Sequence, residues 1–207
     1  MNVLVIGGGG REHALAFKAA QSSDVSTVYV APGNAGTAIE PKLENVAIDV
    51  NDISALVSFA KGNNIELTIV GPEAPLVAGV VDAFTNEGLM IFGPTQAAAQ
   101  LEGSKAFTKD FLARHNIPTA EYQNFTEIDP AIAYVREKGA PIVVKADGLA
   151  AGRGVIVAMT ERDAEEAIRD MLAGNAFGDA GSRVVIEEFL EGEEASFIVM
   201  VDGTNVL

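Results

Sequence analysis

The sequence predicts an α/β fold in which a parallel sheet wound with helices is followed by a smaller α+β lobe. Short β-branched runs alternate with segments of helical periodicity through the first half of the chain, which is typical of parallel sheets with helical crossovers. Further along, the apolar runs Ile142–Val144 and Val155–Val157 flank a segment that contains three glycines. This pattern predicts a strand, a glycine-rich loop and a second strand.

Composition places the chain among globular proteins with room for more than one core. Of its 207 residues, 48% are hydrophobic and 21% are charged. Asp and Glu outnumber Lys and Arg by 29 to 14, and the resulting net charge of −15 opposes binding to nucleic acid or anionic membranes. The absence of cysteine excludes disulfides and thiolate metal sites. The apolar run Val3–Ile6 is too short for a signal sequence or membrane span, so we expect a cytoplasmic monomer.

The first lobe is expected to span residues 1–103. Its predicted strands are Val3–Ile6, Val28–Val30, Ala47–Val50, Leu67–Val70 and Leu89–Phe92. Its predicted helices run from Arg11 to about Gln21, from an N-cap at Asn51 or Asp52 onward, and from Pro75 to Gly88. This alternation predicts strands that lie parallel in one sheet.

The glycine-rich turn Gly7–Gly10 invites comparison with the dinucleotide-binding fingerprint. If Gly7 is the first glycine, Glu12 occupies the position of the third, and if Gly8 is first, His13 occupies it. No acid ends the second strand to bind a ribose 2′-hydroxyl, so a nicotinamide or flavin enzyme is disfavoured. What remains is a helix N-terminus at the carboxyl end of a strand, a general site for anions.

Residues 104–121 are expected to form a helix and a connector. Ser104 is the predicted N-cap of a helix that runs to about His115 and carries Lys105 in its first turn. The second lobe, residues 122–190, should contain helices from Thr126 to Gly139 and from Thr160 to Gly174, the hairpin around Lys145, and a strand at Val184–Phe189. Residues 191–207 begin a third unit with a hairpin turn at Asp202-Gly203. We therefore expect the chain to be part of a longer protein.

Lys145 lies inside an apolar run, where an unpaired ammonium is costly to bury, so an anion is expected near it. Glycines between Gly148 and Gly154 allow backbone N–H groups to wrap a polyphosphate, and Arg153 adds a second positive charge. The strand Val184–Phe189 ends in acids suited to the adenine amino group and the ribose hydroxyls. Together these segments predict a nucleotide clamp, and the alternative is a tight hairpin with an unrelated lysine.

The two histidines, His13 and His115, are isolated in the sequence and fit neither a triad nor a metal motif. We expect both to be structural or solvated. No residue stands out as a nucleophile or general base, so no catalytic residue and no metal ligand is assigned within residues 1–207.

Six motifs distributed along the whole chain are similar to those of one enzyme family. They are Gly7-Gly8-Gly9-Gly10-Arg11-Glu12-His13-Ala14, Ala31-Pro32-Gly33-Asn34-Ala35-Gly36-Thr37, Gly71-Pro72-Glu73-Ala74-Pro75-Leu76, Gly103-Ser104-Lys105, the loop from Lys145 to Gly154, and Glu187 to Ser196. Through them the chain resembles the ATP-grasp ligases, and within that superfamily the glycinamide ribonucleotide synthetases (phosphoribosylamine-glycine ligases) of purine biosynthesis.

The resemblance implies a Rossmann-like, pre-ATP-grasp domain, then a small ATP-grasp lobe, then a central ATP-grasp domain of which only the start is present. It implies that ATP phosphorylates the carboxylate of glycine and that the amine of phosphoribosylamine attacks the glycyl phosphate. The products would be glycinamide ribonucleotide, ADP and phosphate. Mg2+ or Mn2+ would assist, with ligands expected beyond residue 207, so the chain as given is expected to lack ligase turnover.

The resemblance also implies which residues bind ligands. The implied ATP contacts are Lys105, Lys145, Gly148, Gly152, Arg153, Gly154, Glu187, Phe189, Leu190, Glu193 and Glu194. Glu193 and Glu194 are alternatives for the ribose hydroxyls, because they are neighbours in the sequence. The implied substrate contacts are Gly9, Gly10, Arg11, Pro72 and Glu73, although a tight turn and a loop carboxylate explain the same residues. The alternative functions are another ATP-grasp ligase or carboxylase component, and a non-catalytic nucleotide-binding module.

Overall fold

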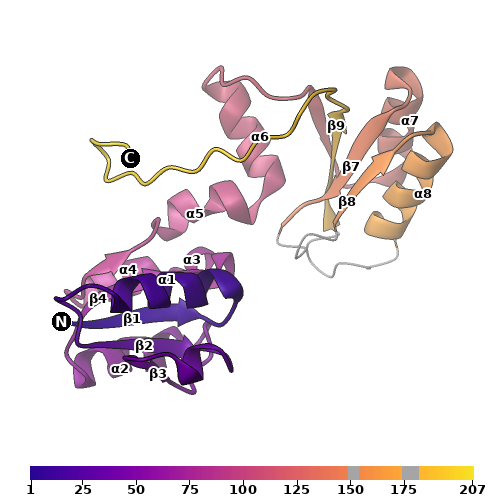
Figure 1. Cartoon of the computed structure of the whole chain (residues 1–207). Helices are drawn as coiled ribbons and strands as arrows, with labels where there is room; N and C mark the ends of the chain where they lie inside the picture. Colours follow the sequence, from indigo (N-terminus) through magenta and orange to yellow (C-terminus); the bar gives the residue numbers. More distant parts are fainter. Residues whose placement is uncertain (149–153, 174–181) are drawn as a thin grey trace.

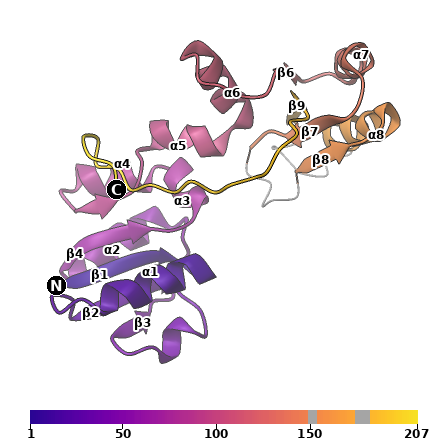
Figure 2. The ribbon, with the colours of Figure 1, turned by 45° about the horizontal axis from the view of Figure 1, so that its top comes forward.

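The computed structural model describes residues 1–148, 154–173 and 182–207, which form two sheets (Figure 1). The first has the strand order β3-β2-β1-β4-β5 with parallel pairing, and the second has the order β6-β9-β7-β8 with antiparallel pairing. Two helices, α5 (Gln96–Gly103) and α6 (Lys105–Arg114), lie between the sheets in both views (Figures 1 and 2). The predicted α/β fold with a parallel sheet followed by a smaller α+β lobe is confirmed.

Both faces of the parallel sheet are covered. Its strands are β1 (Asn2–Gly7), β2 (Thr27–Pro32), β3 (Leu43–Asn45), β4 (Ile65–Val70) and β5 (Ile91–Phe92). Its helices are α1 (Gly10–Ala20), η1 (Thr37–Ile39), α2 (Ile53–Gly62), α3 (Glu73–Val77) and α4 (Val80–Asn86). Leu4 and Ile6 pack with Leu56 and Phe84, whereas the alternate residues Val3 and Val5 pack with α1. Burial on both faces explains why β1 is a continuous apolar run.

Three features of this lobe differ from the sequence expectation. The strand predicted at Ala47–Val50 is wrong: β3 lies at Leu43–Asn45, and the next apolar residues pack into the core from a loop. The helix predicted from Pro75 to Gly88 is divided into α3 and α4 at Gly79, whose φ of 94° glycine adopts readily. Helix α5 was not predicted, because its alanine-rich sequence carries only a weak apolar stripe.

The second sheet has one face covered by the two helices of its own lobe. Its strands are β6 (Tyr122–Phe125), β7 (Ile142–Ala146), β8 (Val155–Ala158) and β9 (Val184–Glu188), and its helices are α7 (Ile128–Lys138) and α8 (Glu161–Leu172). The side chains of Ile142, Val144 and Ile186 belong to the core that the two helices cover. Since neighbouring residues in a strand point to opposite faces, Lys145 and Glu187 lie on the other face.

Of the two helices predicted to begin after a threonine in this lobe, one begins where it was predicted. The hydroxyl of Thr160 accepts a hydrogen bond from the backbone N–H of Asp163 (3.2 Å), which confirms Thr160 as the N-cap of α8. Thr126 is not the cap of α7, since the helix begins one residue later, after Glu127. A residue with a side-chain oxygen before an apolar run therefore predicts the start of a helix to within one or two residues.

After β9 the chain runs back toward the first lobe (Figure 2). Met200 and Leu207 exchange two backbone hydrogen bonds (2.9 and 3.0 Å), and Val201 bridges Val206, which confirms the predicted turn at Asp202-Gly203. Within residues 191–207, strand pairing is confined to this bridge. In the described parts of the chain, no helix is both long enough and apolar enough to span a membrane.

Candidate functional site

The ammonium of Lys145 lies on the face of the second sheet opposite α7 and α8, the face that α6 approaches. Its Nζ donates to Glu187 Oε2 at 2.9 Å. The strand register places Lys145 opposite Val185 and Glu187 opposite Val143, so the two charged side chains meet diagonally across β7 and β9. The anion expected beside Lys145 is therefore supplied by the second motif of the predicted clamp.

Lys105 approaches the same region from α6. Its Nζ donates to the carbonyl oxygen of Gly148 at 2.7 Å, immediately after the end of β7. Burial lowers the pKa of the Lys105 ammonium; nearby Asp147 opposes this effect, and the charge of Lys145 adds to it. The structure thus brings Lys105, Lys145, Gly148 and Glu187 together, although Lys105 and Glu187 are far apart in the sequence.

Asp147 ties the start of α6 to the end of β7. Its carboxylate accepts hydrogen bonds from the Ser104 hydroxyl (3.0 and 3.2 Å) and from the backbone N–H groups of Ala106 (3.2 Å) and Gly148 (2.9 Å). Arg183 lies 3.6 Å away. A carboxylate at a helix N-terminus is favoured by the helix dipole. Sequence reasoning did not select Asp147, although an acid directly after a strand that carries a lysine was a usable signal.

Lys109 is a second residue that sequence reasoning missed. Its side chain is only 10% exposed, and its Nζ lies 2.9 Å from Glu187 Oε2 and donates to Thr119 Oγ1 at 2.7 Å. It follows Lys105 by one helical turn, so both ammonium groups leave the same face of α6. That spacing was the available signal, and Lys109 extends the cation cluster to three lysines: Lys105, Lys109 and Lys145.

The other predicted ATP contacts lie on two segments, one that follows β7 and one that follows β9. Gly148 and Gly154 stand at the two ends of the segment 149–153, and the Gly154 carbonyl accepts a hydrogen bond from the backbone N–H of Ala146 at 2.8 Å. Gly152 and Arg153 lie outside the described residues. The remaining predicted contacts on the segment that leaves β9 are exposed: Leu190, Glu193 and Glu194. The choice between the two glutamates therefore stays open.

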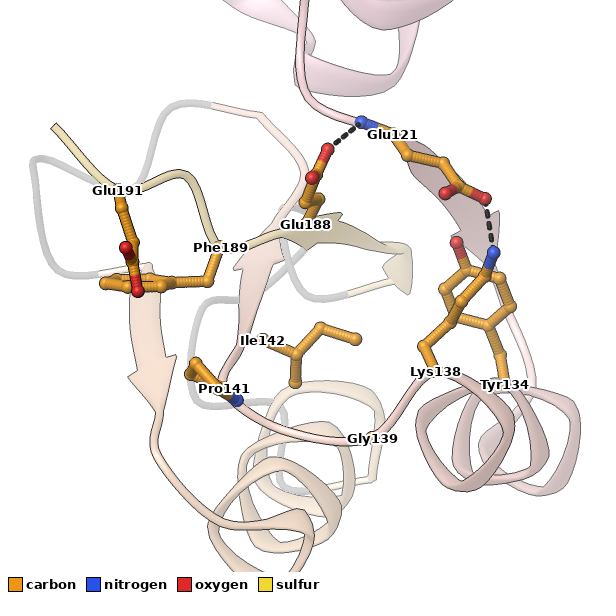
Figure 3. A pocket seen from close by; sticks show the side chains of 9 residues that line it. All are labelled: Glu121, Tyr134, Lys138, Gly139, Pro141, Ile142, Glu188, Phe189 and Glu191. Carbon is orange, nitrogen blue, oxygen red and sulfur yellow. Dashed lines mark hydrogen bonds and ion pairs between the residues drawn. The ribbon is translucent and has the colours of Figure 1, made fainter.

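Phe189 and Glu188 line a separate pocket of about 410 Å³ where β7 begins and β9 ends (Figure 3). The carboxylate of Glu188 accepts a hydrogen bond from the backbone N–H of Glu121 at 3.2 Å. Phe189 and Glu191 both line this pocket (Figure 3). Because side chains alternate along a strand, Glu187 and Glu188 serve opposite faces of the sheet. Phe189 follows the end of β9, and its side chain lines the same pocket as Glu188. It is therefore placed with Glu188 and not with the lysine cluster.

The predicted substrate residues meet where the strand order of the parallel sheet reverses. Gly9, Gly10 and Arg11 follow β1, while Pro72 and Glu73 follow β4, the neighbouring strand. Ligands of open α/β sheets bind in the crevice at such a point. The predicted residues from two distant segments are therefore brought to one edge of the sheet.

Arg11 and Glu73 are in direct contact at this edge. Arg11 Nη2 donates to Glu73 Oε1 at 3.0 Å, and this hydrogen bond raises the pKa of the Arg11 guanidinium. The pKa of the Glu73 carboxyl is lowered, first by a hydrogen bond from its own backbone N–H and then by Arg11, against partial burial. Both side chains line a pocket of about 320 Å³ together with Ala99 and Glu102 of α5.

Glu12 fixes the backbone beneath this pair. Its Oε2 accepts a hydrogen bond from the Gly9 backbone N–H at 2.7 Å, while Oε1 is buried without a hydrogen-bond partner among the described residues. A Cβ at Gly7 or at Gly71 would lie 2.2 Å from Glu12 Cγ, so both glycines are required by close packing. Gly10 is different, because a Cβ there would meet nothing within 4 Å.

In the part of the chain that the structure describes, each histidine has one recorded side-chain partner, and neither partner belongs to a catalytic triad. His13 Nε2 lies 3.3 Å from Glu40 Oε1, and the ring of His115 stacks on Phe111 at 4.4 Å between centroids. Among the described residues, no group of three or more His, Cys, Asp or Glu side chains is arranged to hold a metal ion.

Two family models match consecutive parts of the chain. The model for the N domain of phosphoribosylglycinamide synthetase matches residues 1–102, and the model for its ATP-grasp (A) domain matches residues 103–207. The chain belongs to the phosphoribosylglycinamide synthetase family. This confirms the resemblance that the six sequence motifs indicated.

Phosphoribosylamine–glycine ligases of Vibrio parahaemolyticus and Salmonella typhimurium are 80% and 79% identical to this chain over all 207 residues. The matches cover 48% of each relative, so the chain spans about half the length of the curated relatives it matches. A crystal structure of the phosphoribosylamine–glycine ligase of Thermotoga maritima matches the whole chain and 48% of its own chain, with a TM-score of 0.80 and 29% identity. An ADP complex of N5-carboxyaminoimidazole ribonucleotide synthetase shares the fold, with a TM-score of 0.70, 18% identity, and coverage of 91% and 47% of the two chains.

Proposed function

We propose that this chain carries the ATP-binding lysines and the amine-substrate site of a ligase that joins glycine to phosphoribosylamine. The products are glycinamide ribonucleotide, ADP and phosphate. The observation that supports this most is the convergence of Lys105 and Lys145 beside the glycine-rich segment of a chain whose net charge is −15. A protein of that overall charge holds a polyphosphate only where cations are concentrated locally.

In this proposal the chain's contribution to catalysis is electrostatic. ATP transfers its terminal phosphoryl group to the glycine carboxylate, which gives a glycyl phosphate that the amine of phosphoribosylamine attacks. Two anions must approach one another in the first step, and the ammonium groups of Lys105 and Lys145 offset their repulsion. The backbone of Phe189 and Leu190 is our proposed contact for adenosine, and the carboxylate of Glu187 pairs with the lysines beside the proposed triphosphate site.

On the substrate side, we propose that phosphoribosylamine binds at the edge formed by β1 and β4. The backbone N–H groups at the start of α1, at Gly10 and Arg11, point outward from a helix N-terminus, which suits a phosphate. The Arg11 side chain is 67% exposed and adds a full positive charge. Glu73 is placed to accept hydrogen bonds from the amine or the ribose hydroxyls in the pocket that it shares with Arg11.

The family's phosphoryl transfer is suited to Mg2+ or Mn2+, but the described residues do not form a ligand set for either ion. We therefore derive no step through a metal ion. We also propose a cytoplasmic monomer that acts on small molecules and has no nucleic-acid or membrane partner. The 29 acidic residues against 14 basic ones support the last of these, because a net negative charge opposes binding to nucleic acid and anionic membranes.

A thermal-shift panel tests the proposal, with ATP, NAD and glycinamide ribonucleotide added separately. A ligand present at a hundred times its Kd stabilises the folded state by about 2.7 kcal/mol, so binding is readily visible. We expect ATP and glycinamide ribonucleotide to raise the melting temperature and NAD to leave it unchanged. Stabilisation by NAD in the absence of any shift with ATP would contradict the proposal. Turnover is then measured in the full-length protein.

A further inference from the structure

One carboxylate oxygen in the lysine cluster receives two ammonium groups. Lys145 Nζ and Lys109 Nζ each lie 2.9 Å from Glu187 Oε2. The carboxylate is nearly enclosed, with 7% of its side chain exposed. A buried carboxylate normally needs one cationic partner to offset its lost hydration, so the second ammonium calls for an explanation.

The two lysines are held very differently. Lys109 has three acceptors, Glu187 Oε2, Thr119 Oγ1 at 2.7 Å and the Ala120 carbonyl at 3.4 Å, which match the three donors of an ammonium. Lys145 has Glu187 as its partner among the described residues, and its side chain is 26% exposed against 10% for Lys109. Lys109 is therefore anchored, whereas Lys145 is the member of the pair that can leave.

If Lys145 turned from Glu187 to a phosphate group, Glu187 would still be paired with Lys109. Without Lys109, the same movement would leave a buried carboxylate with no counter-ion, which is strongly unfavourable. The other groups that face Glu187 do not replace Lys109. Lys105 is engaged with the Gly148 carbonyl, and the hydroxyl of Tyr122, opposite Glu187 in β6, donates to Asp110 at 2.8 Å.

We propose that Lys109 is a positioning residue that keeps the buried Glu187 carboxylate paired with a counter-ion, so that Lys145 is free to bind the phosphates of a nucleotide. The proposal rests on the proposed function, because it assumes that a nucleotide binds beside Lys145. Lys109 itself touches neither the nucleotide nor the reacting atoms. Its effect should therefore appear in the recognition of phosphate and not in the recognition of the nucleoside.

The test compares the affinities of the protein for ATP and for adenosine by isothermal titration calorimetry. In Lys109→Met we expect the ratio of ATP to adenosine affinity to fall by about tenfold or more, since a tenfold change is the ordinary scale of one charge interaction. Lys109→Arg is the matched control, because it keeps the charge, and its ratio should stay within about threefold of wild type.

Equal losses of ATP and adenosine affinity in Lys109→Met, or no loss of either, would overturn the inference and leave the proposed function intact. Failure of the wild-type protein to bind ATP would overturn both. If Lys109→Met does not fold, Glu187→Gln is compared with the double variant Lys109→Met/Glu187→Gln, in which no buried charge is left unpaired. The inference then requires the same ATP-to-adenosine ratio in both, and a lower ratio in the double variant contradicts it.

Discussion

The two sheets place their candidate site residues in opposite ways. In the parallel sheet, Arg11 and Glu73 follow the ends of strands, because both faces are buried under helices and only the edge is free. In the antiparallel sheet, Lys145 and Glu187 lie within strands, because α7 and α8 cover one face only. The side chains of Arg11 and Glu73 are 67% and 37% exposed, whereas that of Glu187 is 7% exposed. The comparison teaches that the charged side chains at the edge of the parallel sheet contribute little to the free energy of unfolding. Those on the antiparallel sheet contribute much more.

The largest effect is expected from Glu187→Ala, which leaves Lys109 and Lys145 without their shared carboxylate. Removal of one partner from a buried ion pair typically destabilises by about 3–5 kcal/mol. Urea unfolding of the variant should therefore show a loss of that order. A loss below about 1 kcal/mol would mean that this cluster behaves like an ordinary surface pair, and the contrast between the sheets would disappear.

Asp147→Ala should follow, since Asp147 joins α6 to the end of β7. It removes a charged acceptor from the Ser104 hydroxyl and from two backbone N–H groups, and hydrogen bonds to charged groups contribute about 1.5–3 kcal/mol each. We expect a loss of about 2 kcal/mol in the free energy of unfolding, the contribution of one such bond and not the sum of three, because water can hydrogen-bond donors that the substitution exposes. Asp147→Asn is the matched control: it keeps one acceptor oxygen and should lose less. Equal losses in the two variants would show that the hydrogen bonds are not the cause.

A smaller change is expected from Glu73→Gln at the edge of the parallel sheet. Exposed ion pairs contribute about 0–1 kcal/mol, and salt screens them. The variant should unfold within about 1 kcal/mol of wild type, and the difference should shrink as ionic strength rises. A loss comparable to that of Glu187→Ala would remove the distinction between the two regions.

The smallest effect is the pH dependence of that same pair. Because the pKa of Glu73 is lowered in the folded state, its stabilisation is complete above the ordinary glutamate pKa of about 4.3 and is lost as pH falls through the folded-state value. The difference in unfolding free energy between wild type and Glu73→Gln should be constant from pH 6 to 7 and decline below about pH 4. An increase in that difference toward low pH would mean that the pKa of Glu73 is raised, not lowered, in the folded state.

Sequence reasoning succeeded where local signals and tertiary packing agree. The apolar run of β1 and the capping threonine of α8 predicted their elements because each signal acts within a few residues. It failed at Ala47–Val50, where apolar residues are buried from a loop, and at Gly79, where a helical pattern continues across a left-handed residue. Strand alternation and helical spacing in a sequence indicate which side chains are buried. Side chains can also be buried from a loop, so these patterns do not prove a regular strand or helix.

The candidate site shows the same limit. The motifs around Lys145 and Glu187 indicated a nucleotide site, but nothing local showed that these two side chains contact each other. For Lys109 the local signal was its spacing of one helical turn from Lys105, but its contact with Glu187 depends on the docking of α6 against β9, which no local pattern shows. For Asp147 the local signal was its place directly after β7, but its partners in α6 and at Ser104 lie more than forty residues earlier in the chain.

The affinity of the protein for ATP in wild type and in Lys145→Met tests the central claim most directly. Lys61→Met is the control, because Lys61 lies in α2 of the parallel-sheet lobe and pairs with Glu87. Isothermal titration calorimetry should show ATP binding in wild type and in Lys61→Met, and binding at least about tenfold weaker in Lys145→Met, as expected for loss of a direct contact between charges. Equal ATP affinity in Lys145→Met and wild type would contradict the account.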